Sequence, residues 1–330
     1  MKKTRKPVTL MCVQPSILYY AWQIEVMLTN FQEKQIDTEF DIECLFAFNK
    51  NEDDWEEKVA LIKKVEAKFE GVAKFFFYED TRQYPISYIS SIRPNILKKH
   101  FNAFADLKNE VIFYHDCDMI FAKFPIFLHN YQQKDYNWYV SDTVSYIGYD
   151  YIKSKGDDVL FKMCDIVGID PIEVQQRQLQ SGGAQYIMKG VDYNFFHKVE
   201  KDCERMYKEI SELNQRKKAL DPTHHELQIW TSDMWCILWN AWLRGYNTNV
   251  IKEMDFSWAT DPIEKYETLS IFHNAGVVGN EPTKVFYKGL YTNKIPYSDD
   301  LSDVDETKCS KNYANLIMEV AKNSCLTEKN

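Results

Sequence analysis

Glycine and proline are scarce in this chain of 330 residues, which contains 11 glycines and 10 prolines. Their combined share is about half of the average usage of these two residues. Phosphate-binding loops of the P-loop and dinucleotide types depend on clustered glycines, and proteins made of many tight hairpins depend on glycine turns. The composition therefore disfavours all three classes, and it makes each glycine pair in the chain informative.

The chain also has no long hydrophobic run and no excess of basic charge. Residues 1–7 are basic, as at the start of a signal peptide, but the apolar run that follows spans only residues 8–13. We therefore expect no signal peptide, no membrane-spanning helix and no membrane partner. The 40 Lys and Arg residues are outnumbered by 49 Asp and Glu residues, which gives a formal net charge of −9. This charge excludes a uniformly basic nucleic-acid binder, although not a local basic patch.

The eight cysteines include no C-x-x-C pair, and most of them lie within apolar segments. This pattern is typical of buried, reduced thiols. We therefore expect a cytoplasmic protein, located in the host cytoplasm if the protein is viral. Hydrophobic residues make up 45% of the chain and charged residues 27%, as is ordinary for globular proteins, and the length is sufficient for a large core.

The first part of the chain alternates between strand and helix patterns. We predict the order β-α-β-α-β, with strands at residues 8–13, 42–48 and 74–78 and helices at residues 19–31 and 55–69. A helix at residues 90–105 and a wholly apolar, central strand at residues 111–114 follow. Such alternation is typical of an α/β fold with a mostly parallel central sheet flanked by helices.

The second part alternates less regularly. We predict strands at residues 138–140 and 186–188, a long charged helix at residues 191–215 and an apolar helix at residues 223–243. Because no linker or repeat divides the chain, we predict one domain over residues 1–297 whose C-terminal half elaborates the active site. Residues 298–330 are predicted to form an acidic tail with a short helix near residues 313–321.

The sharpest local feature is a pair of carboxylates, Asp116 and Asp118, directly after the apolar strand. Ligands of α/β proteins bind at the carboxyl ends of the strands, and carboxylate oxygens suit Mg²⁺ or Mn²⁺. The spacing alone is common, since Asp303-Val304-Asp305 repeats it in the polar tail. The apolar strand is what favours a metal or nucleotide site, because two buried carboxylates without a cation are costly.

Three further features are candidates for the same site. Gly182 and Gly183 precede an apolar strand, which indicates either an ordinary turn or a backbone that approaches a ligand. Asp233 lies at the edge of an apolar helix face, where a structural ion pair is the alternative to a functional role. His273 follows an apolar run and precedes a glycine turn, so a metal ligand and a core histidine both remain open.

Two other polar segments are candidates for binding. Arg93, at a helix start, is a candidate partner for a carboxylate or a phosphate. His224, His225 and Glu226 have the composition of a metal cluster, but Thr223 and Glu226 have the spacing of a capping box. We predict that this segment caps the helix at residues 223–243.

These motifs, in this order, resemble the glycosyltransferase type A (GT-A) family, whose members use nucleotide sugars. In that family a D-x-D motif is followed by a glycine loop, an acidic residue on a helix and a C-terminal metal-binding histidine. The resemblance covers roughly residues 8–290, and segments 14–23 and 273–276 are more distantly similar to the hydroxyproline arabinosyltransferase and serine galactosyltransferase group. The matching residues are Asp116 with Asp118, Gly182 with Gly183, Asp233 and His273.

The resemblance implies a role for each of these residues. Asp116, Asp118 and His273 would bind Mn²⁺ or Mg²⁺, and Asp233 would contact the acceptor or the sugar, as a base if the reaction inverts. Arg93 is a candidate to stabilise the leaving diphosphate, which makes Asp233 and Arg93 the catalytic candidates. The predicted donor-binding set is Gln14, Ser16, Gln23, Arg93, Asp116, Cys117, Gly182 and Gly183.

The predicted reaction transfers a pentose or hexose from a nucleoside diphosphate sugar, expected to be a UDP-sugar, to a hydroxyl group. The more distant subgroup implies a retaining reaction. A protein hydroxyl, a glycan and a hydroxymethylated base in DNA all suit this chemistry as acceptors. For DNA, the clusters at residues 98–100 and 216–218 are candidate phosphate contacts, although solvated helix ends also explain them.

Two other classes of function remain open at this point. A two-metal nuclease or nucleotidyltransferase requires a third acid beside Asp116 and Asp118. A non-catalytic carbohydrate-binding protein would use the aromatic residues, which make up 15% of the chain, and would bind sugar in the presence of a chelator.

Overall fold

The computed structural model describes residues 6–83, 86–131, 136–279, 281 and 283–327. Contacts within the chain divide it into two compact units. The first unit consists of residues 1–79, 113–132 and 253–330, and the second of residues 80–112 and 133–252. The division predicted between residues 297 and 298 stays a prediction.

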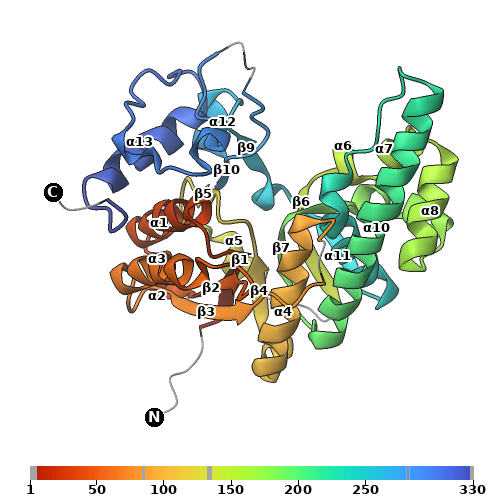
Figure 1. Ribbon diagram of the computed structural model, residues 1–330, viewed down its shortest axis with the longest axis horizontal. Coiled ribbons are helices and arrows are strands. Elements are labelled where there is room, and N and C mark those ends of the chain that lie inside the picture. Colours follow the sequence, from red (N-terminus) through yellow and green to blue (C-terminus); the bar gives the residue numbers. More distant parts are fainter. Residues whose placement is uncertain (1–5, 84–85, 132–135, 280, 282, 328–330) are drawn as a thin grey trace. The chain divides into compact units, whose positions relative to one another are not determined.

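Seven strands form the larger sheet. They are β1 (Val8–Pro15), β2 (Asp41–Phe48), β3 (Lys74–Glu79), β4 (Val111–Tyr114), β6 (Asn137–Asp142), β7 (Gly182–Met188) and β8 (Asn247–Val250). Their order is β3-β2-β1-β4-β7-β6-β8. The pairs β1–β2, β2–β3 and β6–β8 are parallel, whereas β6–β7 is antiparallel. Helices flank these strands (Figure 1), and the predicted α/β class with a mostly parallel sheet is confirmed.

The first unit carries the smaller sheet and a helical cover. A three-stranded sheet has the order β5-β10-β9, formed by β5 (Met119–Phe121), β10 (Ile271–His273) and β9 (Phe256–Trp258). The helices are α1 (Leu18–Glu33), α2 (Ile36–Glu39), α3 (Trp55–Lys68), α5 (Phe127–Asn130), α12 (Ile263–Thr268) and α13 (Ser310–Ala321). The helix predicted near residues 313–321 corresponds to α13, which packs against α1.

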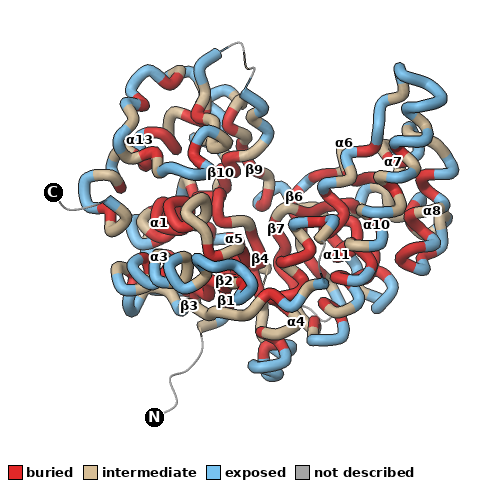
Figure 2. Tube along the Cα trace, in the orientation of Figure 1, coloured by how far each residue is buried: buried red, intermediate tan, exposed pale blue. Residues whose placement is uncertain are grey.

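A hydrophobic cluster in the first unit joins the segments that carry the polar motifs. Trp22 of α1, Ile120 of β5 and Phe272 of β10 belong to it, together with Phe286 and Tyr291 farther along the chain. All five are nearly inaccessible to solvent, as the red segments of Figure 2 show for α1 and β10. Since successive side chains along a strand point to opposite faces, burying Phe272 of β10 in this cluster turns its neighbour His273 to the other face of the small sheet.

The second unit is mainly helical around strands β6, β7 and β8. Its helices are α4 (Ile92–Ala103), α6 (Val144–Ile147), α7 (Tyr149–Lys153), α8 (Asp157–Val167), α9 (Pro171–Gln176), α10 (Tyr193–Leu220) and α11 (Ser232–Leu243). The long helix α10 packs against α4, α8 and α11. Among the residues that the structure describes, no helix is both long and apolar enough to cross a membrane.

One predicted helix begins later than its sequence pattern indicated. We predicted a helix over residues 223–243, but α11 starts at Ser232, after a 3₁₀ turn at Ile229–Thr231. The predicted capping box is therefore wrong. The Thr223 N–H and hydroxyl both bond to the Asp221 carboxylate, at 2.9 and 2.6 Å, so the threonine closes a local turn after α10 instead.

The eight cysteines carry free thiols, seven of them buried and Cys325 half-buried. Burial raises the pKa of Cys164 and of Cys325 to about 12, so these thiols remain protonated and poorly reactive at neutral pH. This agrees with the buried thiols predicted from the sequence.

Asn30 of α1 provides a direct test of how the first unit holds the end of β5. Its side-chain amide donates to the Phe121 carbonyl at 3.1 Å, and the Phe121 N–H donates to its oxygen at 2.9 Å. Asn30→Ala leaves both buried backbone groups without these partners, and we expect the free energy of unfolding to fall by about 2 kcal/mol in urea denaturation. The exposed Asn102→Ala should stay within about 0.5 kcal/mol of wild type, and equal stability of the two variants would contradict the assignment.

Candidate metal and nucleotide site

The D-x-D segment leaves the end of β4 and leads directly into β5. The His115 N–H donates to the Met11 carbonyl of β1 at 3.0 Å, which aligns the start of the segment with β1. The chain then turns, and β5 pairs antiparallel with β10, with Met119 opposite His273. The Asn274 N–H also donates to the Asp118 carbonyl at 2.9 Å. The strand register therefore places His273 beside Asp118, although they are 155 residues apart in the sequence.

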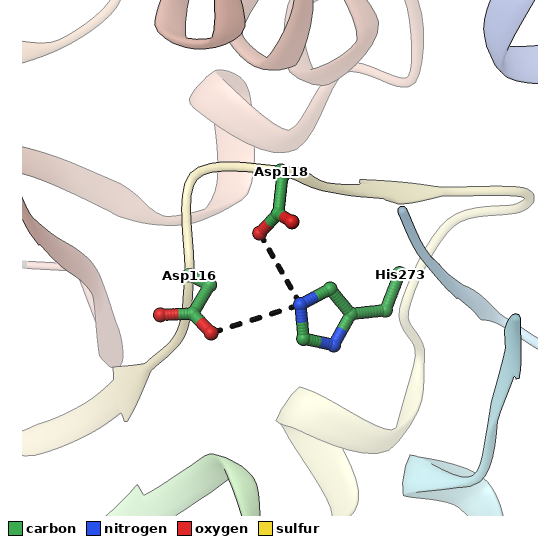
Figure 3. Close-up of side chains that lie close together, drawn as sticks. All are labelled: Asp116, Asp118 and His273. Carbon is green, nitrogen blue, oxygen red and sulfur yellow. Dashed lines mark hydrogen bonds and ion pairs between the residues drawn. The ribbon is translucent and has the colours of Figure 1, made fainter. Parts of the chain in front are cut away.

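Asp116, Asp118 and His273 form one compact cluster in the first unit (Figure 3). The His273 Nε2 atom lies 3.2 Å from Asp118 Oδ1 and 3.6 Å from Asp116 Oδ2. Asp118 and His273 are each 5% exposed, whereas Asp116 is partly accessible. The structure thus brings together the three residues predicted as metal ligands.

The donor set fits a divalent cation. One candidate ligand atom from each residue lies within 4.8 Å of the others. Ligands held at about 2.1 Å in neighbouring octahedral positions are about 3 Å apart, close to the separations in the cluster. Carboxylate oxygens suit Mg²⁺ and Mn²⁺, and imidazole suits transition metals, so two carboxylates with one imidazole are chemically suitable for such an ion.

Lys288 was not predicted, yet it contacts the same carboxylate. Its ammonium group pairs with Asp118 Oδ2. Burial alone would raise the pKa of Asp118, but the charges of Lys288 and His273 outweigh burial and hold this pKa well below its ordinary value. Burial likewise opposes the charge on Lys288, and Asp118 raises the pKa of Lys288 above its ordinary value. Asp118 is therefore ionised at neutral pH, and the stability that its ionised form contributes is lost progressively as the pH falls below the ordinary pKa of an aspartate.

Several buried polar groups in the same unit have no hydrogen-bond partner among the described residues. They include both amide atoms of Gln14, the Ser16 hydroxyl and both amide atoms of Asn274. Gln14 and Ser16 lie at the carboxyl end of β1, and Asn274 follows His273. Such groups are unusual in native proteins because each costs about 1–3 kcal/mol. Unsatisfied amides and a hydroxyl at a strand end are suited to binding a polar ligand.

Gln23 and Cys117, also predicted as donor-binding residues, are enclosed in the first unit. The Gln23 amide donates to the Tyr19 carbonyl one turn earlier in α1, at 2.6 Å. Cys117 lies between the two aspartates, and burial raises the pKa of its thiol well above the ordinary value. Neither side chain shows an orphaned polar atom comparable to that of Gln14.

Asp233 and Arg93, the predicted catalytic residues, form an ion pair in the second unit. Arg93 Nη1 donates to Asp233 Oδ2 at 2.9 Å, and the Tyr88 hydroxyl lies 2.6 Å from Asp233 Oδ1. The Asp233 N–H also donates to the Tyr88 oxygen at 3.1 Å. Burial and the adjacent carboxylate raise the pKa of Tyr88 well above its ordinary value. A buried aspartate is thus held in one orientation by an arginine and a tyrosine.

The glycine pair allows close packing at the start of β7. A Cβ atom on Gly182 would lie 2.2 Å from Val140 Cγ2, and one on Gly183 would lie 2.7 Å from Met234 Cε. The strand register shifts here, and Ala184 adopts a φ of 66°. This φ is uncommon for a residue with a side chain. Contacts within the protein therefore explain why both positions are glycine. The predicted role of Gly182 and Gly183 in binding the donor stays a prediction.

The candidate DNA-binding clusters are engaged in ion pairs. Lys98 pairs with Glu200, Lys217 with Asp158, and Lys218 with Glu226. His100 is buried. These contacts favour the interpretation of both clusters as paired helix ends rather than as phosphate-binding patches.

Three side chains that contact or adjoin the predicted site residues were not predicted from the sequence, those of Lys288, Asn274 and Tyr88. Lys288 lies in an aromatic segment, and nothing in its spacing distinguishes it from the other lysines. Asn274 could have been identified from the sequence, because it adjoins His273 in the segment that resembles the family. Tyr88 reaches Asp233 across 145 residues, a distance in sequence at which no local pattern applies.

Comparisons with known proteins find similarity only at the level of solved structures. No protein-family model and no curated protein matches the chain. The apo structure of WbbM, a bifunctional glycosyltransferase, matches with 11% identity and a TM-score of 0.49, covering 97% of this chain and 50% of that one. The chain therefore spans about half the length of WbbM.

Two structures of the galactosyltransferase LgtC also match the chain. One is a complex with donor and acceptor sugar analogs, at 14% identity and a TM-score of 0.45, and the other is an active-site mutant, at 14% identity and a TM-score of 0.46. Each match covers 95% of both chains. All these proteins are glycosyltransferases, the class that the sequence motifs resemble. At this level of similarity, the reaction is inferred from the site residues.

Lys288→Met tests the charge balance of the cluster. The variant leaves Asp118 buried without its lysine partner, so we expect the free energy of unfolding of the metal-free protein to fall by about 3 kcal/mol. Added Mn²⁺ should stabilise the variant more than wild type, because the ammonium group no longer competes for the carboxylate. Urea denaturation with and without Mn²⁺ measures both effects.

The matched control is Lys284→Met, which breaks the exposed pair with Asp303. Exposed pairs contribute little to stability, so this control should remain near wild type in both measurements. If Lys288→Met behaves in the same way as Lys284→Met, the lysine is not the counter-ion of Asp118.

Proposed function

We propose that the protein is a metal-dependent glycosyltransferase that moves a pentose or hexose from a nucleoside diphosphate sugar to a hydroxyl group. The observation that carries this proposal is the cluster of Asp116, Asp118 and His273, assembled from a strand end and a distant strand. The motif order that resembles the GT-A family supports it, as do the orphaned polar groups of Gln14 and Ser16.

In this proposal the first unit binds the donor. Asp116, Asp118 and His273 would hold Mn²⁺ or Mg²⁺, which supplies Lewis-acid neutralisation of the leaving diphosphate when bound. Lys288 keeps a positive charge beside Asp118 and limits the negative charge that the diphosphate meets. Gln14 and Ser16 offer amide and hydroxyl groups for the nucleoside, for which uridine is the expected base.

We also propose a role for Asp233, which the resemblance to the GT-A family matches to an acidic residue that contacts the sugar or the acceptor. During transfer the bond between the anomeric carbon and the diphosphate oxygen breaks, a bond to the acceptor oxygen forms, and the acceptor hydroxyl releases its proton. Arg93 and Tyr88 hold the Asp233 carboxylate, so it can position a sugar or acceptor hydroxyl and can accept the proton in an inverting reaction. We expect the reaction to retain the anomeric configuration. In that case Asp233 positions the sugar or the acceptor hydroxyl, and the proton leaves with the diphosphate.

The two alternative functions differ from this one in measurable ways. A two-metal nuclease or nucleotidyltransferase would place a third acid in the cluster, whereas the third member here is His273 and Lys288 also contacts Asp118. A carbohydrate-binding protein would not need the divalent-cation site. Candidate acceptors for the enzyme are a protein hydroxyl, a glycan or hydroxymethylated DNA.

Asp118→Asn tests the proposed function. We expect wild type to hydrolyse one member of a panel of UDP-sugars slowly in the presence of Mn²⁺, and EDTA to abolish this activity. The variant should lose at least about 100-fold in rate, because it removes a ligand of the cation. Release of UDP, followed by chromatography, measures the reaction.

The chain supplies a matched control in its second D-x-D sequence. Asp303→Asn changes the same residue type in the same spacing, on an exposed side chain that pairs with Lys284, and should leave the rate unchanged. Activity that survives Asp118→Asn or EDTA would contradict the proposed function, as would turnover of DNA or nucleoside triphosphates in place of UDP-sugars.

A further inference from the structure

A second pocket, separate from the metal cluster, lies within the second unit beside α10. Its cavity volume is about 360 Å³. Tyr207, Ser211 and Gln215 recur every four residues on one face of α10 and line one wall. Gln228 and Trp230, which precede α11, line the opposite wall.

The pocket has a fixed frame. The buried Asn214 amide donates to the Leu227 carbonyl at 3.1 Å and accepts from the Leu227 N–H at 3.4 Å, which fastens the wall segment to α10. The ring of Tyr207 stacks on that of the buried Tyr88, with centroids 4.8 Å apart and planes at 21°. A frame that is held in this way can bind a ligand with little ordering of its own.

Trp230 gives the pocket an aromatic platform. It is 61% exposed, whereas Trp22, Trp138, Trp235 and Trp239 are fully buried. Trp230 is also one of the residues that line the pocket, so its exposed ring is accessible to a ligand there. The apolar C–H face of a sugar ring can pack flat on such a ring, and the sugar hydroxyls then point outward to polar groups.

The other lining groups are neutral and available for hydrogen bonds. Among the described residues, no hydrogen bond is made by the Tyr207 hydroxyl, the Ser211 hydroxyl or the side-chain amides of Gln215 and Gln228. Hydroxyls and amides both donate and accept, which matches the hydroxyl groups of a sugar. The charged lining residue, Glu226, is paired with a lysine at 3.2 Å. The lining contains no Lys or Arg to attract a phosphate.

The pocket connects to Asp233 through one tyrosine. The Tyr88 hydroxyl lies 2.8 Å from the Trp230 carbonyl oxygen and 2.6 Å from Asp233 Oδ1. Tyr88 therefore contacts the backbone of Trp230 and stacks on Tyr207 in the opposite wall. It also orients the Asp233 carboxylate. A ligand resting on Trp230 would lie next to the segment that carries Asp233.

We propose that this pocket binds the acceptor, and that the acceptor is a neutral carbohydrate whose ring packs on Trp230. The assignment of the ligand as acceptor rests on the proposed glycosyltransferase function. The assignment favours a glycan hydroxyl over hydroxymethylated DNA, because a DNA acceptor would bring phosphates to a pocket whose lining contains no Lys or Arg.

Quenching of tryptophan fluorescence by iodide tests the pocket directly. Trp230 is the most exposed tryptophan and should account for most of the quenching. Maltose, cellobiose and lactose serve as neutral probes, and inorganic phosphate and an oligothymidine of eight nucleotides as anionic ones. We expect at least one disaccharide to protect wild type from iodide in a saturable manner, and the anionic probes to give no protection.

Two variants identify the tryptophan that reports binding. Trp230→Phe should remove the protection, whereas Trp55→Phe, which changes a half-buried tryptophan on α3, should retain it. Protection by the oligothymidine or phosphate, absence of protection by all three disaccharides, or protection that survives Trp230→Phe would each overturn the proposal.

A kinetic test links the pocket to transfer. Gln228→Ala should raise the KM for the protecting sugar by about 10-fold, the loss of one hydrogen bond, with a smaller effect on kcat. Gln175→Ala, on the exposed surface of α9, is the control and should leave both constants unchanged. Equal KM values for the two variants would overturn the acceptor assignment. The quenching test needs neither donor nor metal, so its failure is distinct from failure of the donor hydrolysis test.

Discussion

The carboxylate of Asp118 is the group on which the rest of the site depends. It is buried and ionised, and a buried negative charge persists only beside positive charge or a cation. His273 contacts one of its oxygens and Lys288 the other. The hydrophobic cluster of the first unit sets both contacts, because its members Ile120, Phe272 and Phe286 lie one or two residues from the three polar groups. Packing of the hydrophobic core thus holds the Asp118 carboxylate, the His273 imidazole and the Lys288 ammonium group in an arrangement suited to a divalent cation.

Much of the fold could be predicted because its patterns are local. The apolar run at residues 111–114 matches the observed strand β4 at both ends, and the first three strands were also located from their hydrophobic runs. The pair Asp116 and Asp118 was identifiable because a polar motif followed a strand without polar residues. Its link to His273 came from the order of motifs in a resembled family, since no periodicity relates residues so far apart.

Other features depend on tertiary contacts and could not be predicted. Lys288 is one lysine among many in the sequence, and only the folded chain places it beside Asp118. The helix predicted from Thr223 begins at Ser232 because Asn214 holds Leu227 in an extended segment, a contact between two elements. Three short helices between residues 144 and 176 also show too little of a helical period to be predicted, since each spans six residues or fewer.

The most direct test of the central claim is an anomalous difference map from crystals of the protein grown with Mn²⁺ and UDP. The account predicts one strong manganese peak within bonding distance of Asp116, Asp118 and His273, about 2.1–2.2 Å from the ligand atoms. A manganese peak elsewhere, or no peak at a concentration that saturates UDP binding, would contradict the account.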